Sequence, residues 1–410
     1  MSVSSGEFLL ALAVISATFF FLPSPRLRQT TLAACNAVFL YTLVPGAETW
    51  LGLAVFLLSG YAVAILLIRK PSAWICGGYL SLMVAAFVVL KKYEVFAYFL
   101  PERLFDHPVA IVGLSYMLFR QIHFVVDAMQ GQIASPSLWT YLNYQLNLFA
   151  LLSGPIQRYQ EFDTQWNAMR PVLKDRHEVL KAYLRILTGV IKIAVIAVFC
   201  LALYERADVV ELKTSLKHHL KGPVMFYLYP AYVYFNFSGY CDIVIGGAAL
   251  VGIRLPENFD RPYLARNMID YWNRWHQTLS FWIRDYIFTA SYKALAQTWP
   301  RYAMAWAIPC YFVALFLAGV WHGATMNFVV FGLLNGFGVS MAKAWEMLLV
   351  KRNGRKWFRE YMRNRKIQAA AIVLNFHFAC ITFLFFPVGL TRDLQRIADF
   401  FAPIVTAGGG

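Results

Sequence analysis

Two short segments place a histidine directly after a tryptophan, in a chain that is otherwise mostly apolar. Residues 271–282 read YWNRWHQTLSFW and contain His276, and residues 319–325 read GVWHGAT and contain His322. An imidazole exchanges protons near neutral pH, so a histidine held in an apolar pocket suits general acid–base chemistry. The two segments are therefore candidate parts of one catalytic or binding site.

The residues around His322 are those expected of a pocket wall. Glycines at 319 and 323 allow close backbone approach and a break between membrane spans. Trp321 supplies an aromatic wall, and Asn327 follows as a polar group. This pattern presents an imidazole to a substrate. The alternative is a histidine that only makes a hydrogen bond between two membrane helices.

The segment around His276 mixes aromatic and polar residues more densely. On a continuous helix Trp272 and Trp275 would share one face, whereas Asn273 and His276 would share an adjoining polar face. The alternative without catalysis is an amphipathic helix at the membrane interface, with aromatic side chains among the headgroups and arginines on phosphates. That alternative leaves the asparagine and the histidine unexplained.

Charged residues accompany this segment and interrupt the apolar stretch that follows it. Arg274 lies beside His276, and Arg284 and Asp285 divide the apolar residues within 279–292. The interruption indicates a re-entrant or interfacial segment. Because Arg284 and Asp285 are adjacent on a helix and point in different directions, we expect each to have its own partner. Structural or partner-binding roles are predicted for all three.

The elements that must position these residues are membrane helices. Of 410 residues, 59% are hydrophobic, 17% aromatic and 14% charged, whereas soluble domains have about 25% charged residues. Runs of about 20 apolar residues predict an all-α polytopic membrane protein with about 11 transmembrane helices. The runs are 7–22, 30–48, 49–68, 73–90, 108–128, 137–154, 179–203, 222–253, 302–320, 322–342 and 369–390, of which 222–253 is either one tilted helix or a broken pair.

The net charge of +15 is distributed as in a membrane protein and does not indicate a nucleic-acid partner. Residues 351–366 hold eight basic residues and one acidic residue, and 254–301 hold seven basic against four acidic. Basic loops stay in the cytoplasm, and two predicted spans separate these loops. His276 then lies on the cytoplasmic side. His322 lies toward the opposite side, or at depth below an outward-facing pocket, so the two line one passage rather than share a metal.

Four sequence blocks, in order, resemble the signatures of the membrane-bound O-acyltransferase family. They are GLSYMLFRQIHFVVDA (113–128), LLSGPIQRYQEF (151–162), the segment from FNFSGYCDIV to IRDYIF (235–288), and GVWHGATMNFVVFGLLNG (319–336). The resemblance implies a single membrane-embedded domain over 1–410, with 108–390 as catalytic core and peripheral helices in 1–107. It further implies a ring of helices around a thin centre, where a cytoplasmic and an outer funnel meet.

The resemblance also implies roles for individual residues. His322 matches the catalytic histidine, which acts as general base on an acceptor hydroxyl, and His276 matches a second family histidine near the donor entrance. Substrate or tunnel-lining roles fall to Trp272, Asn273, Trp275, Trp321 and Asn327. Arg274 belongs to the matched segment around His276, and Asp285 to a recurring Arg-Asp-Tyr triplet with a structural role.

The implied reaction moves an acyl group across the membrane, from a cytoplasmic thioester to a hydroxyl of a cell-envelope polymer. The donor is a phosphopantetheinyl carrier protein or acyl-coenzyme A, and no bound cofactor or metal is indicated. An acidic carrier protein suits the basic cytoplasmic face, an outer-face transfer protein is a further expected partner, and membrane lipids surround the protein. We expect the bacterial cytoplasmic (inner) membrane as its location.

The acyl group follows from the branch of the family. The compact length and the segments 280–288 and 376–386 resemble the branch that transfers D-alanyl groups to lipoteichoic acid. Residues 289–292, Thr-Ala-Ser-Tyr, stand where polysaccharide O-acetylases carry Pro-Leu-Gly-Gly. O-acetylation of a polysaccharide or peptidoglycan is the alternative. A transporter or flippase is a third reading, which predicts two related halves with interrupted helices, and the sequence shows no such symmetry.

Overall fold

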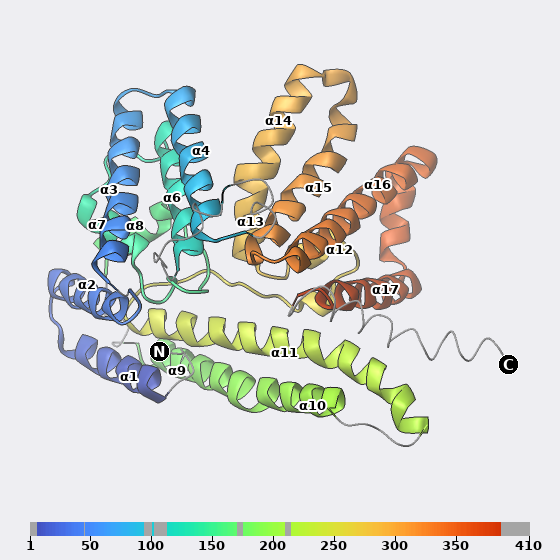
Figure 1. Ribbon diagram of the computed structural model, residues 1–410, viewed down its shortest axis with the longest axis horizontal. Helices are drawn as coiled ribbons and strands as arrows, with labels where there is room; N and C mark the ends of the chain where they lie inside the picture. Colours follow the sequence, from blue (N-terminus) through green and yellow to red (C-terminus); the bar gives the residue numbers. More distant parts are fainter. Residues whose placement is uncertain are drawn as a thin grey trace. The chain divides into compact units, whose positions relative to one another are not determined.

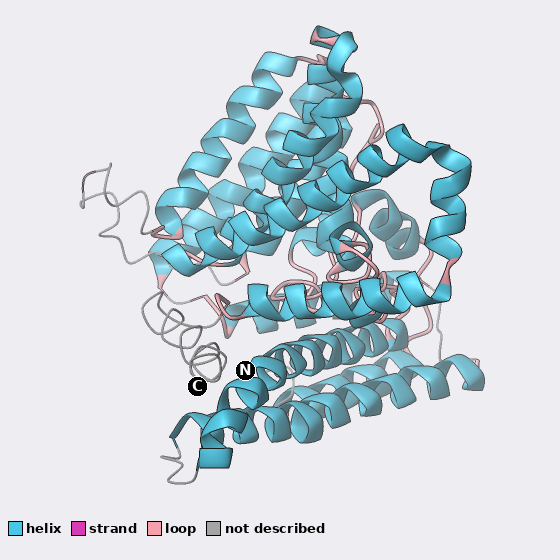
Figure 2. Ribbon diagram, turned by 90° about the vertical axis from the view of Figure 1, so that its right-hand side faces the viewer, coloured by secondary structure: helices cyan, strands magenta, loops and turns pink. Residues whose placement is uncertain are grey.

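The computed structural model describes residues 6–44, 46–93, 101, 113–169, 175–209 and 215–386. Within these residues the regular elements are helices, and one antiparallel bridge joins Phe259 to Trp275 outside any strand. Figure 2 shows helices connected by loops throughout. The prediction of an all-α chain is confirmed for this part of the sequence.

The chain divides into two compact units. The first comprises Met1–Ala194 and Phe237–Glu257, and the second comprises Val195–Asn236 and Asn258–Gly410. The expected single membrane-embedded domain, with 1–107 peripheral and 108–390 catalytic, stays a prediction.

The described residues of the first unit form eight helices and part of a ninth, among which α3, α4 and α6 lie side by side (Figure 1). The eight are α1 (Gly6–Phe21), α2 (Pro25–Tyr41), α3 (Ala47–Arg69), α4 (Ala73–Leu90), α6 (Leu114–Met129), α7 (Leu138–Gln145), α8 (Tyr159–Asn167) and α9 (Arg176–Ile191). Serines begin three of them: the side chain of Ser24 accepts from the amide of Leu27 at α2, that of Ser72 from the amide of Ile75 at α4, and that of Ser137 from the amide of Thr140 at α7. Such caps satisfy amide groups that the first turn leaves unpaired.

A buried arginine in the first unit explains why the predicted span 137–154 is wrong. Helix α7 has only eight residues, about 12 Å of helix, and the hydrocarbon core of a bilayer is about 30 Å thick. Arg120 of α6 donates hydrogen bonds of 2.8 Å to the carbonyls of Tyr144 and Gln145, and another to that of Ala150. The guanidinium thus satisfies carbonyls that the interrupted helix leaves unpaired.

The second unit holds the two histidine segments. Its elements are α10 (Val198–Val209), the first part of α11 (Ser215–Leu250), α12 (Met268–Trp272), α13 (Gln277–Ile283), a π-helical turn (Arg284–Phe288), α14 (Thr289–Thr298), α15 (Ala303–His322), α16 (Met326–Arg363) and α17 (Arg365–Phe383). A further π-helical turn, Lys192–Ala197, follows α9. The run 222–253 lies almost entirely in α11, a single helix that contains Pro223 and Pro230.

Helices α15 and α16 form an antiparallel hairpin, drawn in orange in Figure 1. Near the turn their backbones almost touch, because a Cβ atom added at Gly319 would lie 2.2 Å from the Cα of Gly332. Farther from the turn, the hydroxyl of Ser340 donates to the carbonyl of Ile308 at 3.0 Å. Small residues permit this close packing of membrane helices, and the close approach predicted at Gly319 is confirmed.

Six helices among the described residues are long and apolar enough to cross a membrane. They are Ala47–Arg69, Ala73–Leu90, Arg176–Arg206, Pro300–His322, Met326–Arg363 and Arg365–Phe383. Each overlaps a predicted span, and Met326–Arg363 extends well beyond the predicted 322–342. Helix α1 is apolar but shorter. The predicted span 108–128 begins outside the described residues, and 369–390 ends outside them. The total of about 11 crossings therefore stays a prediction.

Candidate active site

A turn between α12 and α13 buries His276 instead of presenting it on a polar helix face. The residue has φ 45° and ψ 51°, in the left-handed region, and only 1% of its surface is exposed. The predicted continuous helix through this segment is wrong, and Asn273 lies exposed at the end of α12. The backbone explains the break: the amide of Asp260 donates to the carbonyl of Arg274 at 2.9 Å, taking an acceptor that a continuous helix would use.

The imidazole of His276 is held by an asparagine side chain. Its Nδ1 atom lies 3.1 Å from Oδ1 of Asn258. The same oxygen accepts hydrogen bonds from the amide of Thr278 at 3.2 Å and from its hydroxyl at 2.9 Å. His276 lies outside the six candidate spans. Burial, and secondly the charge of His322, hold the pKa of His276 well below its ordinary value, so the ring is neutral near pH 7.

His322 is the last residue of α15, and aromatic rings surround it. The centroid of its ring lies 5.0 Å from Trp321, 5.4 Å from Phe386, 5.8 Å from Phe331 and 6.5 Å from Phe328. The Nε2 atom is shielded from solvent. The helix end and the aromatic rings together give the imidazole an apolar setting with a fixed position.

Trp321 brings the two histidine segments together. Its ring centroid lies 6.5 Å from that of His276 and 5.0 Å from that of His322. Both imidazoles thus lie near one indole. Their separation is small compared with the thickness of a bilayer core, which is roughly 30 Å. The prediction that the two histidines lie toward opposite sides of the membrane is therefore wrong. The end of α15, which carries Trp321 and His322, lies beside the turn that carries His276.

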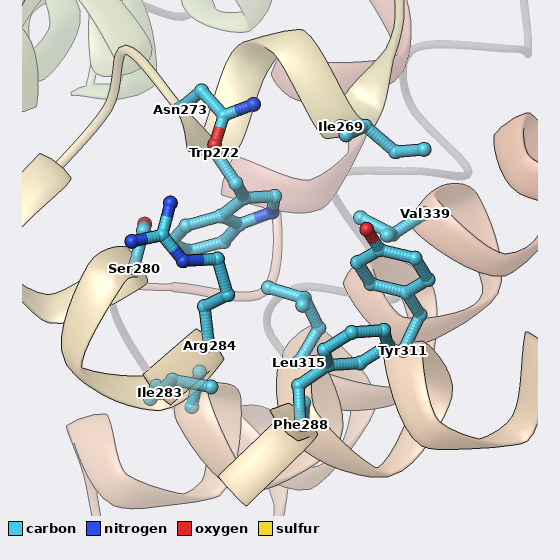
Figure 3. Close-up of a pocket in the computed structure, with 12 residues that line it drawn as sticks. Ile269, Trp272, Asn273, Ser280, Ile283, Arg284, Phe288, Tyr311, Leu315 and Val339 are labelled. Atoms are coloured by element: carbon cyan, nitrogen blue, oxygen red, sulfur yellow. The ribbon is translucent and has the colours of Figure 1, made fainter. Parts of the chain in front are cut away.

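The second unit contains a cavity of about 180 Å³, and neither His276 nor His322 is among the residues that line it. Trp272, Asn273, Ser280 and Arg284 line it together with other residues of α12, α13 and the π-helical turn, and residues of α15 and α16 complete the wall. Figure 3 shows Arg284 and Ser280 on one side, with Tyr311, Leu315 and Phe288 opposite. Ala318 also lines the cavity and precedes His322 by four residues, so the two share a helix face. The cavity therefore reaches within one helical turn of the imidazole.

The indole of Trp272 is fixed by a residue that the sequence did not single out. Its N–H donates to Oδ1 of Asn335 at 3.2 Å, and the amide nitrogen of Asn335 donates to the carbonyl of Phe331 at 2.8 Å. Asn335 is therefore oriented by α16 and holds a wall of the cavity in place. Trp275, in contrast, lies outside the cavity and stacks on Tyr271, with ring centroids 5.8 Å apart.

The sequence profile of the membrane-bound O-acyltransferase family matches residues 99–387, which is more than half of the 410 residues. The chain belongs to the membrane-bound O-acyltransferase family. Membership makes it an acyltransferase, and the six candidate spans make this O-acyltransferase a multi-pass membrane protein.

Relatives of this O-acyltransferase include proteins with two different names. A teichoic acid D-alanyltransferase of Bacillus subtilis is 29% identical over 290 residues, covering 68% of this chain and 69% of the relative. That of Streptococcus thermophilus is 26% identical over 292 residues, covering 69% of each. A probable alginate O-acetylase of Pseudomonas fluorescens is 26% identical over 362 residues, covering 84% of this chain and 66% of the relative.

The charged residues of the O-acyltransferase segment pair locally. Arg274 bonds Asp270 with Nε 2.7 Å from Oδ1, and Arg284 bonds its neighbour Asp285 with Nε 3.0 Å from Oδ1. The contact between Arg284 and Asp285 was not predicted, and the expectation that each has its own partner stays a prediction for Asp285. The long arginine side chain reaches the adjacent carboxylate within the π-helical turn, and its guanidinium also lies 4.8 Å from the ring centroid of Phe281.

Asn327 is buried, 1% exposed, in the first turn of α16. It is close in sequence to His322 but does not line the cavity.

Among the described residues no group of three or more histidine, cysteine or acidic side chains is arranged to hold a metal ion. The residues that sequence reasoning missed, Asn258, Asn335 and Phe386, reach the site from other segments; the first two lie within the matched family blocks, which was the available signal.

Proposed function

We propose that this O-acyltransferase moves an acyl group from a cytoplasmic thioester across the membrane to a hydroxyl of a cell-envelope polymer. His322 is the general base in this proposal. The observation that supports it is the position of His322 at the end of α15, among aromatic rings and one helical turn from Ala318 of the cavity. An apolar setting favours a neutral imidazole, which is the form that can accept a proton.

In the proposed reaction His322 takes the proton of the acceptor hydroxyl while the hydroxyl oxygen attacks the thioester carbonyl. A tetrahedral intermediate forms and collapses as the carbon–sulfur bond breaks. The new ester leaves with the acceptor, and the departing thiolate receives the proton held by His322. No group besides donor and acceptor is consumed. The cavity beside Trp272 and Arg284 is the proposed place for the acyl end of the donor.

The donor is proposed to arrive from the cytoplasm on a phosphopantetheinyl carrier protein, with acyl-coenzyme A as the second source. Exposed basic side chains in the last part of α16 support this proposal. They are Lys351, Arg352, Arg355, Lys356 and Arg359. An acidic carrier is attracted to such a surface. The proposal includes the bacterial cytoplasmic membrane, a ring of about 11 helices with two funnels, and an outer-face protein that receives the acyl group.

D-alanyl transfer to a teichoic acid is the first candidate, because teichoic acid D-alanyltransferases are among the relatives and Thr289–Tyr292 lacks the pattern of the acetylases. Acetyl transfer to a polysaccharide or peptidoglycan is the second. It is favoured by the alginate O-acetylase alignment, which covers 84% of this chain. Both candidates use the same base and the same thioester chemistry.

His322→Gln tests the proposal. The amide cannot accept the hydroxyl proton, and loss of a general base lowers a rate about 10²–10⁴-fold. Alkali-labile D-alanine and acetate are measured by mass spectrometry on envelope material from cells producing either protein at equal membrane levels. We expect one of the two esters to fall to the level of a deletion strain. His177→Gln, at an exposed position of α9, is the matched control and keeps the wild-type amount.

The ester that disappears identifies the acyl group. Wild-type ester levels in the His322→Gln strain would contradict the catalytic assignment. A deletion strain that loses neither ester would reject both acyl candidates and leave the transporter reading.

A further inference from the structure

A short extended segment, residues 258–260, clamps the turn that carries His276. The amide of Gln277 donates to the carbonyl of Asn258 at 3.0 Å, and the amide of Asp260 donates to the carbonyl of Arg274 at 2.9 Å. These two hydrogen bonds lie on either side of His276 and hold the turn like a pair of antiparallel strands. A left-handed φ of 45° is strained for a residue with a side chain, so the clamp has to hold this conformation in place.

The side chain of Asn258 determines which ring nitrogen of His276 carries the proton. A backbone amide can only donate, so the amide of Thr278, 3.2 Å away, identifies the facing Asn258 atom as the oxygen. An amide oxygen can only accept. The Nδ1 atom of His276, 3.1 Å from the same oxygen, must therefore be the donor and carry the hydrogen. In a neutral imidazole the other nitrogen, Nε2, then holds the lone pair.

We propose that Asn258 is a positioning residue that fixes His276, whose ring lies near that of Trp321, as the neutral Nδ1-protonated tautomer with Nε2 as a proton acceptor. This inference deepens the acyl-transfer function and rests on it for its kinetic consequences. Asn258 is itself 1% exposed, so its orientation is set by the protein and not by solvent.

A neutral amide in this position has a consequence for the reaction. When His322 accepts the hydroxyl proton it becomes positively charged, and a second positive charge nearby would oppose that step. An amide oxygen bonds the Nδ1–H of His276 without favouring its imidazolium form. A carboxylate in the same place would favour the imidazolium. Asparagine thus leaves the single positive charge of the reaction to His322.

The charged and titratable groups near His276 come from the clamp segment, from α12, from α15 and from the turn after α13. Asp260, on the clamp segment, lies 3.8 Å from the guanidinium of Arg274, and Arg274 also pairs with Asp270 of α12. From α15 comes His322, whose charge acts on His276. Arg284, which follows α13, pairs with Asp285. A carboxylate at position 258 would add a negative charge directly at Nδ1.

Asn258→Asp is the kinetic test, and the expected result is a shift in the pH profile. The new carboxylate stabilises the His276 imidazolium, which then persists to higher pH. We expect acyl transfer near pH 7 to fall at least about tenfold and to recover as the pH rises, so the acid limb of the kcat profile moves to higher pH. Asn267→Asp is the matched control, because it adds the same charge at a helix N-cap that bonds Asp270 and not a histidine.

If Asn258 only supported the fold, Asn258→Asp would lower activity equally at every pH, and the limb would stay in place; that result would overturn the proposal. The control must keep both the rate and the profile of the wild-type enzyme.

A second measurement uses the wild-type protein and no activity assay. ¹⁵N-histidine spectra of the intact protein in lipid nanodiscs, compared with those of His276→Gln, identify the His276 signals. The expected signals show a protonated Nδ1 and an unprotonated Nε2. A proton on Nε2 overturns the inference even if His322 is catalytic, and the expected tautomer supports it even if acyl transfer is disproved.

Discussion

The two histidines lie in different local settings. His276 is fixed through a hydrogen bond to Asn258 within a turn whose backbone is paired on both sides. His322 is positioned by the end of α15 and by packing against Phe331 and Phe386. The hydrogen bond to Asn258 specifies which nitrogen of His276 carries the proton, and the aromatic rings specify where the His322 ring lies.

The pH dependence of stability provides a test at His276. Its folded pKa is lowered, while in the unfolded chain it is about 6.5, so the unfolded state binds the additional proton as the pH falls. Neutral His276 contributes full stability above about pH 6.5, and that stability is lost as the pH drops toward the folded pKa. We expect melting temperatures in detergent to fall between about pH 7 and pH 5 in the wild type, and less in His276→Gln. Equal pH dependence in the two proteins would show that His276 does not titrate on unfolding.

Residue types and spacing singled out two segments that the structure brings together at Trp321, but they did not predict how the side chains are held. Trp321 and His322 adjoin in sequence, and the aromatic wall predicted there is present. The contact between Asn258 and His276 spans 18 residues and depends on a left-handed turn that no local pattern indicated. The sequence favoured a regular helix there, because the spacing of apolar residues contains no information about backbone hydrogen bonds to residues 258–260.

Among the helices, the α15–α16 hairpin determines where His322 lies. Gly319 is one turn before His322 and meets Gly332 of α16, so the helix end is set by contact between backbones. Sequence reasoning identified Gly319 but not its partner, since a pairing of helices is not a local property. Six of the predicted spans overlap helices that are long and apolar enough to cross a membrane. The run 137–154 was wrong because Arg120, distant in sequence, stabilises a non-helical path there.

Gly319→Ala tests the close approach. The added methyl would lie 2.2 Å from the Cα of Gly332, and forcing such an overlap costs about 1–3 kcal/mol. We expect a lower melting temperature together with a loss of acyl transfer, because the end of α15 must move. Gly77→Ala on α4 is the matched control: no atom lies within 4 Å of its Cβ, and alanine favours a helix over glycine. If both variants behave alike, the hairpin does not depend on backbone contact.

For the whole chain, the antiparallel hairpin connects the charge pattern to the direction of the reaction. Because Ser340 lies opposite Ile308 and Gly332 opposite Gly319, the start of α15 and the basic part of α16 lie at the same end of the hairpin. The end of the basic segment 254–301, which leads into α15, and the basic residues of α16 therefore lie at one end of the hairpin, which the positive-inside rule predicts to be cytoplasmic. The part of that segment around His276 lies beside Trp321, at the other end of α15 with His322. The proposed function requires an envelope hydroxyl to reach this second end.

Truncated fusions to green fluorescent protein and to alkaline phosphatase test this orientation, since the first reporter is active inside the cell and the second outside. We expect fusions after Trp299 and after Arg363 to be fluorescent without phosphatase activity, because each ends in or beside a basic segment that stays in the cytoplasm. A fusion after Ala324, at the hairpin turn, should show the reverse. Phosphatase activity at Arg363 would place the basic surface outside, where no carrier-bound thioester could reach it, and would refute cytoplasmic donor entry whatever the role of His322.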